Sequence, residues 1–221
     1  MTIDLKMLIS LLDAVANVII REQKVLTELD AAIGDGDFGT SLSSGFGKVQ
    51  EQLPEIERTN MGDILKKVGM TLTTSVGGVS GPIWGTAFMR AGIKAGDKTE
   101  LNLSDLSEMM ESALEGIQAR GNANLGDKTL VDALHPALKE LRRASEENTS
   151  LSEALKRATK AARKGSDKTV DMIAKKGRAS YLGERSKGHR DAGSWAIVLI
   201  LEEITRNLGG NVKTYMKEYE R

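Results

Sequence analysis

Three closely spaced aspartates are the residues of this sequence best suited to chemistry. Asp30, Asp35 and Asp37 follow the spacing D-x4-D-x-D, and Gly34 and Gly36 lie among them. Glycine lets the chain curl tightly, so all three carboxylates can face one point, where a divalent cation would remove their mutual repulsion. Oxygen ligands alone favour Mg²⁺ or Ca²⁺ over zinc or copper. The alternative interpretation is a solvated turn that caps the next helix.

Mg²⁺ fits these aspartates better than Ca²⁺ does. A calcium-binding EF-hand needs a glutamate at the twelfth position of its loop, and counting from Asp30 that position is Ser41. Mg²⁺ commonly binds through a few carboxylates and takes its remaining ligands from water and substrate phosphates. The triad therefore predicts a phosphorylated ligand.

Two further segments could bind phosphate through backbone N–H groups. If Gly39, Thr40 and Ser41 form the first turn of a helix, their unpaired N–H groups and the positive end of the helix dipole face an anion beside the metal. The segment "SVGGVSGP" at 75–82 offers a second set before another helix, with a plain helix connector as its alternative. Together with the triad, the two sets could hold a polyphosphate.

The glycine-rich segment 176–194 adds positive charge. One of its cationic side chains could neutralise phosphate charge in a transition state. His135 and His189 are interpreted as structural or surface residues, and only Asp191 could orient His189 as a base. No serine nucleophile has a base in reach. The chemistry predicted is thus phosphoryl handling. Among the cationic residues of the segment, the candidates are Arg178, Arg185, Lys187 and Arg190.

Helices are expected to position these segments. Apolar residues recur at spacings of three and four along most of the chain, beginning with a helix over about 3–28, and no convincing alternation of apolar and polar residues predicts a strand. We therefore expect an all-α fold of about eight helices, in which the apolar segment "SWAIVLILEEI" at 194–204 is a buried helix. The expected N-caps of later helices are Thr40, Asn60, Ser104, Asp127 and Ser150, the last in a capping box with Glu153.

Composition limits the functions that this chain can have. Its 221 residues, 40% hydrophobic, predict one domain over 1–210 followed by a charged tail over 211–221. Lys+Arg and Asp+Glu both number 31, so no overall attraction to nucleic acid or to an anionic membrane is expected. The absence of cysteine excludes disulfides, zinc–thiolate sites and thiol catalysis. With no signal-peptide pattern and no long apolar run, a cytoplasmic protein is expected.

Four segments, in order, resemble the L subunits of dihydroxyacetone kinases, the DhaL family. They are "LDAAIGDGDFGTSLSSGF", "SVGGVSGPIWGTAFMRAG", "GDKTLVDALHPAL" and "KGRASYLGERSKGHRDAGS", and they span residues 29–194. The resemblance implies an antiparallel barrel of eight amphipathic helices with a nucleotide site at one rim. It also implies a kinase subunit of the phosphoenolpyruvate–glycerone phosphotransferase type, active only with a partner subunit.

The same resemblance assigns site residues. Asp30, Asp35 and Asp37 would hold two Mg²⁺ ions that bridge the phosphates of ADP or ATP, and Arg178 would be the catalytic residue. Many relatives have histidine where this chain has Phe38, so here only the backbone N–H of that residue would serve. The implied nucleotide-binding residues are Phe38, Gly39, Thr40, Ser41, Val79, Ser80, Gly121, Leu130, Arg178, Asp191, Ala192 and Gly193.

The resemblance implies partners as well. In this family a separate K subunit holds the sugar covalently on a histidine, which explains why this chain offers no base of its own. Bound ADP would be rephosphorylated in place by the phosphohistidine-carrying M subunit of the phosphotransferase system. The alternatives are an ATP-exchanging subunit of a kinase for another short ketose or acyl substrate, and a nucleotide-loaded regulatory interaction module. A homodimer is also left open.

Overall fold

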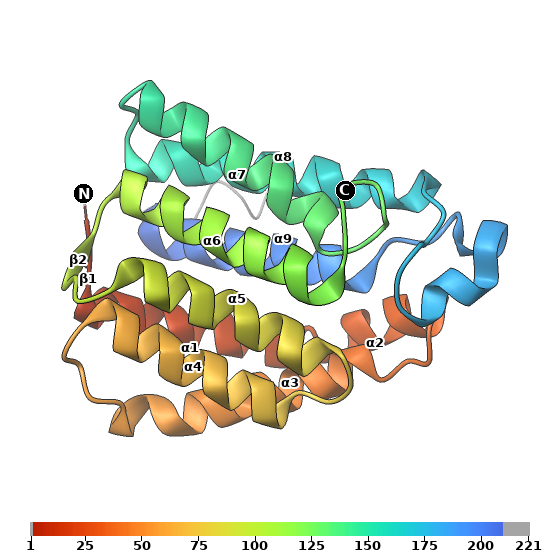
Figure 1. The fold of residues 1–221 in the computed structure, drawn as a ribbon, viewed down its shortest axis with the longest axis horizontal. Helices are drawn as coiled ribbons and strands as arrows, with labels where there is room; N and C mark the ends of the chain where they lie inside the picture. The colour runs from red at the N-terminus through yellow and green to blue at the C-terminus, as the bar shows by residue number, and fades with distance from the viewer. Residues whose placement is uncertain (1, 210–221) are drawn as a thin grey trace.

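The computed structural model describes residues 2–209, and the expected tail over 211–221 lies outside them. Helix dominates the described part (Figure 1), as the sequence predicts. Its α-helices are α1 (Leu5–Arg21), α2 (Gln23–Ala31), α3 (Phe38–Gln52), α4 (Met61–Ser75), α5 (Ser80–Ala95), α6 (Leu103–Gly121), α7 (Val131–Glu146), α8 (Leu151–Lys168) and α9 (Ala192–Leu208). Three 3₁₀ helices accompany them: η1 (Leu53–Glu55), η2 (Thr169–Asp171) and η3 (Arg178–Ser186).

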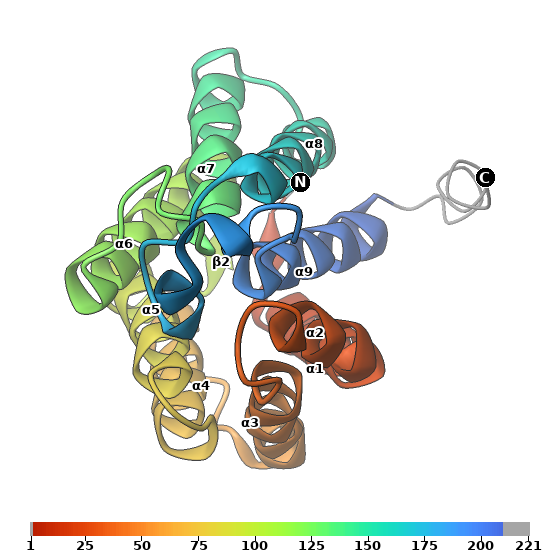
Figure 2. The same ribbon diagram turned by 90° about the vertical axis from the view of Figure 1, so that its right-hand side faces the viewer.

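The helices form a closed ring. From α3 to α9 each helix packs against the next along the chain, and α9 packs against α1, which itself contacts α3 (Figure 2). Only Glu22 separates α1 from α2, so these two make one interrupted rod and the described helices give eight rods. This arrangement agrees with the expected barrel of eight antiparallel helices.

The interior of the ring is apolar because each helix turns one hydrophobic stripe inward. Phe46 of α3 is 1% exposed and meets Trp84 and Phe88 of α5 edge to face, with each pair of ring centroids 6.2 Å apart. Helix α9 has no exposed residue from Ala192 to Thr205 and packs against α1, α7 and α8. The prediction of a buried helix at 194–204 is confirmed.

Two expected helix starts are confirmed. The Asn60 side chain accepts a hydrogen bond from the N–H of Asp63 at the start of α4, and Ser150 accepts one from Glu153 at the start of α8. The bond at Ser150 is one half of the expected capping box.

Three expected helix starts are wrong. Helix α3 begins before Thr40, with Asp37 as N-cap, because the glycine-rich turn already directs the chain into a helix at Phe38. Helix α6 is capped by Asn102, in a reciprocal capping box with Asp105, rather than by Ser104. Helix α7 begins only at Val131, because residues 122–130 form a loop in which Asp127 is buried.

The structure also contains two very short strands that the spacing of apolar residues does not predict. Strand β1 (Ile3–Asp4) pairs antiparallel with β2 (Glu100–Leu101), so the chain preceding α1 is tied to the connection between α5 and α6. A ladder of two residues is too short to show alternation in the sequence.

Helix direction explains where the glycine-rich segments lie. In a ring of antiparallel helices, every second connection returns to the same end. The connections α2–α3, α4–α5, α6–α7 and α8–α9 therefore share one rim, which faces the viewer in Figure 2, while β1 and β2 lie at the opposite end (Figure 1). Among the described residues, no helix has the combination of length and apolar character needed to cross a bilayer.

Candidate metal and phosphate site at the rim

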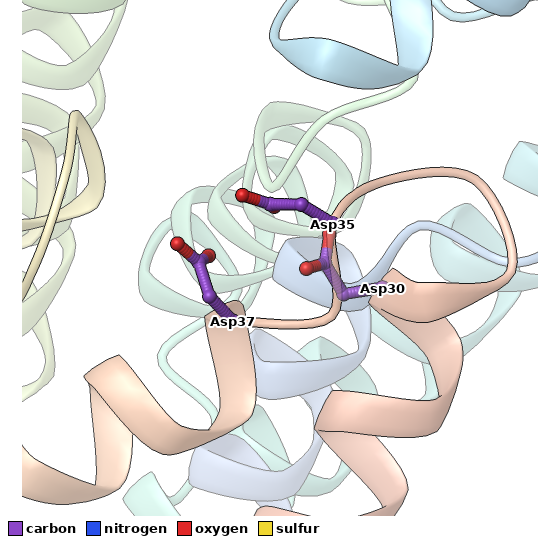
Figure 3. Close-up of side chains that lie close together, drawn as sticks. All are labelled: Asp30, Asp35 and Asp37. Atoms are coloured by element: carbon purple, nitrogen blue, oxygen red, sulfur yellow. The ribbon is translucent and has the colours of Figure 1, made fainter.

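The structure brings the three aspartates together. Asp30 lies in the last turn of α2, Asp35 in the α2–α3 loop, and Asp37 at the N-cap of α3. One carboxylate oxygen of each lies within 4.8 Å of the others, and the side chains converge in Figure 3. The turn also keeps features of the alternative interpretation, because Asp35 and Asp37 are exposed and Asp37 is the N-cap of α3.

Glycines make this convergence possible. A Cβ atom at Gly34 would collide with Oδ1 of Asp30, and Gly36 has φ +73°, a conformation that residues with side chains rarely adopt. The N–H of Phe38 donates to Oδ2 of Asp30 over 3.3 Å, which ties the start of α3 to the end of α2. Buried Ile33 anchors the loop between them.

The charges of the cluster are poorly compensated. Burial raises the pKa of Asp37, and the neighbouring carboxylates of Asp35 and Asp30 raise it further, while Arg178 opposes them. The Arg178 guanidinium contacts Asp35, with 2.9 Å between Nη1 and Oδ2. Three convergent oxygen donors whose repulsion lacks an adequate counter-charge fit Mg²⁺, which prefers such ligands.

The first turn of α3 lies directly beside the triad. Phe38 packs against the hydrophobic core, and buried Gly39 allows α3 to touch α2, because a Cβ there would collide with Gln23 and Thr27. The expectation that the Ser41 N–H is unpaired is wrong: it donates to the Asp37 carbonyl over 2.9 Å, as the first bond of the helix requires.

The α4–α5 connection reaches the same place. A Cβ at Gly77 would lie 2.9 Å from the Ser41 hydroxyl, so this loop borders the first turn of α3. Val79 is the N-cap of α5 and is 72% exposed, and Ser80 opens the helix. The structure thus sets the N-termini of α3 and α5 side by side at the rim.

The remaining expected residues come from the other two connections. Gly121 ends α6 and borders Ile83 of α5, while Leu130 is the N-cap of α7 and borders Gly193. Asp191 caps α9 by accepting the N–H of Ser194 over 2.6 Å, and Ala192 beside it is buried.

Asp191 is an unusual carboxylate. Burial is the main cause that raises the pKa of Asp191 to about 7. The Ser194 N–H and the charge of Lys128 lower this pKa, whereas the charges of Asp132 and Asp30 raise it. Of these effects on the pKa of Asp191, that of the Asp30 charge is the smallest.

Several other candidates point elsewhere. Lys187 pairs with Glu184 over 2.8 Å, and the Arg190 guanidinium pairs with Asp167 and stacks on the ring of Trp195, 4.4 Å from its centroid. Arg185 and the side chain of His189 are exposed. Of the cations in segment 176–194, Arg178 is the one that contacts the triad in the described structure.

Sequence reasoning missed the buried polar residues that hold the third connection. Asp132 is 1% exposed and accepts the N–H groups of Gly126 and Thr129, and Lys128 is 2% exposed. In the sequence, only the polar pair of Asp127 and Lys128 after a glycine indicates that this connection is unusual. The pair does not predict burial, because burial of a charged side chain depends on which distant carbonyls surround it.

The fold and the site define a class: closed rings of antiparallel helices with an acidic cluster at one rim. A crystal structure of the dihydroxyacetone kinase from C. freundii in complex with AMP-PNP and Mg²⁺ has this fold, with a TM-score of 0.68 and 24% identity, covering 90% of this chain and 33% of that one.

The chain belongs to the DAK2 domain family, whose model matches residues 32–206. It is 44% identical over 183 residues to the protein of Escherichia coli (strain K12) named PEP-dependent dihydroxyacetone kinase, ADP-binding subunit DhaL, covering 83% of this chain and 87% of that protein. It is 39% identical over 186 residues to the PTS-dependent dihydroxyacetone kinase, ADP-binding subunit DhaL, of Lactococcus lactis subsp. lactis (strain IL1403), covering 84% and 88%. The resemblance to the L subunits is confirmed.

Proposed function

We propose that this chain is the nucleotide-binding subunit of a dihydroxyacetone kinase. The observation that carries the proposal is the convergence of three carboxylates within 4.8 Å beside the N-termini of α3 and α5. The names of the E. coli and L. lactis relatives, both ADP-binding subunits, support it.

Each part of the rim has a role in this proposal. Asp30, Asp35 and Asp37 would hold Mg²⁺, with two ions as the expected number; the nucleotide would supply the phosphoryl group, and the metal would compensate its negative charge. The first turns of α3 and α5 bind phosphate oxygens through backbone N–H groups. Arg178 adds positive charge, and the segments at Gly121, Leu130 and 191–193 enclose the nucleotide.

The subunit works by positioning and by neutralising charge, which are the main contributions of a protein to phosphoryl transfer. A separate K subunit would hold dihydroxyacetone and supply the base. The words PEP-dependent and PTS-dependent in the relatives' names support a phosphohistidine-carrying M subunit that rephosphorylates ADP in place. The cytoplasmic location and the homodimer stay predictions.

Reconstitution tests the proposal. The purified chain, a K subunit and dihydroxyacetone are mixed with either a phosphorylated M subunit or ATP. Product with the M subunit but not with ATP supports rephosphorylation of bound ADP in place. Product with ATP but not with the M subunit would show that the nucleotide exchanges instead. No product with either donor would contradict a kinase subunit and favour a regulatory module. Native mass spectrometry of the purified chain checks for retained ADP and two Mg²⁺.

A further inference from the structure

Lys128 occupies a cage of backbone carbonyls. The residue lies in the α6–α7 connection with φ +61° and is 2% exposed. Its Nζ lies 2.7 Å from the carbonyl oxygens of Thr169 and Ser186, 2.5 Å from that of His189, and 3.3 Å from that of Met172. An ammonium has three N–H donors, which the three nearest carbonyls take up, with the fourth at the edge of the cage.

The four carbonyls lie on both sides of one loop. Thr169 and Met172 precede segment 173–185, and Ser186 and His189 follow it. Two further bonds close the ends of the loop: Gly188 N–H donates to the Val170 carbonyl over 2.8 Å, and the N–H of Ala174, the second residue of the loop, donates to the Ser186 hydroxyl over 2.9 Å. The ammonium therefore sits at the neck of this loop.

Removing this charge would be costly for the neck. The carbonyl dipoles point their negative ends at one another, and the ammonium replaces the water that buried carbonyls would otherwise need. Burial lowers the pKa of Lys128, and the charges of Asp191 and Asp171 oppose that shift. An apolar side chain of equal length would take the ammonium donor away from all four carbonyls, of which that of Thr169 also accepts the Met172 N–H over 3.2 Å.

The loop carries Arg178 to the aspartate triad. Arg178 opens η3 within segment 173–185, and its guanidinium reaches Asp35 across the rim. An exposed arginine, 71% accessible, can hold such a place only if its backbone is fixed, because its flexible side chain contributes little order of its own.

We propose that Lys128 is a positioning residue, whose ammonium closes the neck of loop 173–185 and thereby sets Arg178 over the three aspartates. The ordering of the loop is independent of any ligand. Its consequence for phosphoryl transfer rests on the function proposed above.

Limited proteolysis of the full chain tests the ordering. An arginine-specific protease reports opening of the loop through cleavage after Arg178 and Arg185, and lysine substitutions leave these sites intact. We expect Lys128→Met to raise the cleavage rate about tenfold or more over wild type. The matched control is Lys176→Met, which removes a lysine of the same loop whose side chain has no ion pair in the described structure, and which keeps both the Lys175–Asp127 ion pair and the backbone bond from Lys175 N–H to the Asp127 carbonyl. Equal cleavage rates for the two variants would overturn the proposal.

Chemical rescue isolates the role of the charge. Lys128→Ala leaves space for a small amine, and n-propylammonium should slow its cleavage towards the wild-type rate, whereas n-propanol should not. Equal protection by the alcohol would show that the side chain only fills volume, and would overturn the proposal.

The wild-type protein provides a measurement should neither variant fold. An amine-acylating reagent can modify Lys128 only when the cage opens, so acylation of Lys128 and cleavage after Arg178 should be slowed by similar factors relative to the unfolded chain. Rapid cleavage while Lys128 stays unmodified would overturn the proposal.

Calorimetry with ADP and Mg²⁺ separates this inference from the proposed function. We expect Lys128→Met and Arg178→Ala to weaken binding by similar factors, and the double variant to bind no more weakly than either. If Lys128→Met is cleaved faster but binds ADP and Mg²⁺ as tightly as wild type, the result would support the closing of the loop by Lys128. It would instead contradict the role of Arg178 in the proposed function.

Discussion

The aspartates at the rim illustrate how a binding residue can oppose folding. Desolvation raises the pKa of Asp37, and the charges of Asp35 and Asp30 raise it further, which means that the folded chain disfavours the ionised form of Asp37. Clustered like charges of this kind are retained when a ligand compensates them. The cluster should therefore cost stability without metal and confer affinity with it.

Replacing one carboxylate tests both effects. In Asp37→Asn we expect the affinity for ADP with Mg²⁺ to fall about a hundredfold or more, because one ligand of the metal is lost. The ligand-free variant should be as stable as wild type or more stable, because repulsion is relieved. Calorimetry measures the affinity and urea unfolding the stability. Asp97→Asn, an exposed position near β2, controls for net charge. An unchanged affinity would contradict the metal site.

Asp191 makes stability depend on pH. Its pKa is about 7 in the folded chain and 3.8 in the reference state, so between these values the folded state binds more protons than the unfolded state. Below pH 4 the Asp191 carboxyl therefore does not lower the free energy of unfolding. Its destabilising effect grows as pH rises and is complete above about pH 7.

The variant Asp191→Asn should remove this pH dependence, because an amide oxygen still accepts the Ser194 N–H but carries no charge. Relative to wild type, we expect the free energy of unfolding of Asp191→Asn to rise by about 2–4 kcal/mol between pH 4 and pH 8. Urea unfolding in the presence of EDTA measures it. A difference that is constant with pH would show that the carboxyl is not buried as described.

Helices α4 and α5 approach each other through glycines. A Cβ added at Gly69 of α4 would lie 2.7 Å from the Gly85 carbonyl and 2.5 Å from Cγ of Met89, both in α5. Atoms cannot pack that closely, so α5 would have to move. Since α5 begins at the rim with Ser80, the close approach also fixes one of the two helix N-termini at the site.

Two alanine substitutions separate packing from helix propensity. Gly69→Ala should lower the free energy of unfolding by about 1–3 kcal/mol through overpacking. Gly47→Ala in α3 meets nothing within 4 Å and should raise it by about 0.5–1 kcal/mol, because alanine loses less conformational freedom in a helix. Urea unfolding measures both. Stabilisation of equal size in both variants would contradict the tight α4–α5 contact.

At the scale of the whole molecule, the site links four connections that are distant in sequence. Arg178 contacts Asp35, and Gly77 borders Ser41, so a ligand bound as proposed would contact segments whose relative positions require the entire ring. Ligand binding and global folding are therefore coupled.

This coupling predicts ligand-dependent thermal stability. ADP and Mg²⁺ together, at a hundred times the dissociation constant, should stabilise the folded chain by about 2.7 kcal/mol. Differential scanning calorimetry should show a higher Tm with both ligands than with either alone. Equal stabilisation by ADP with EDTA would mean that the nucleotide binds without the metal.

The parts that could be read from the sequence are those set by near neighbours. The cap at Asn60, the burial of 194–204 and the convergence of Asp30, Asp35 and Asp37 each depend on residues only a few positions apart. Thr40 and Ser104 are not helix caps, because Asp37 and Asn102, three and two positions earlier, are the N-caps of α3 and α6. The geometry of the preceding turn decides which of the competing residues becomes the cap.

The sequence alone determined the helices, through the period of their apolar residues, and the acidic cluster, through glycines that curl a short loop. Only the tertiary structure decided that Arg178 meets Asp35, that the loop of Gly77 borders Ser41, and that Lys128 is surrounded by carbonyls from beyond α8. The physical reason is that these contacts arise from rigid helices packing into a closed ring, and local spacing carries no record of which loops that packing brings together.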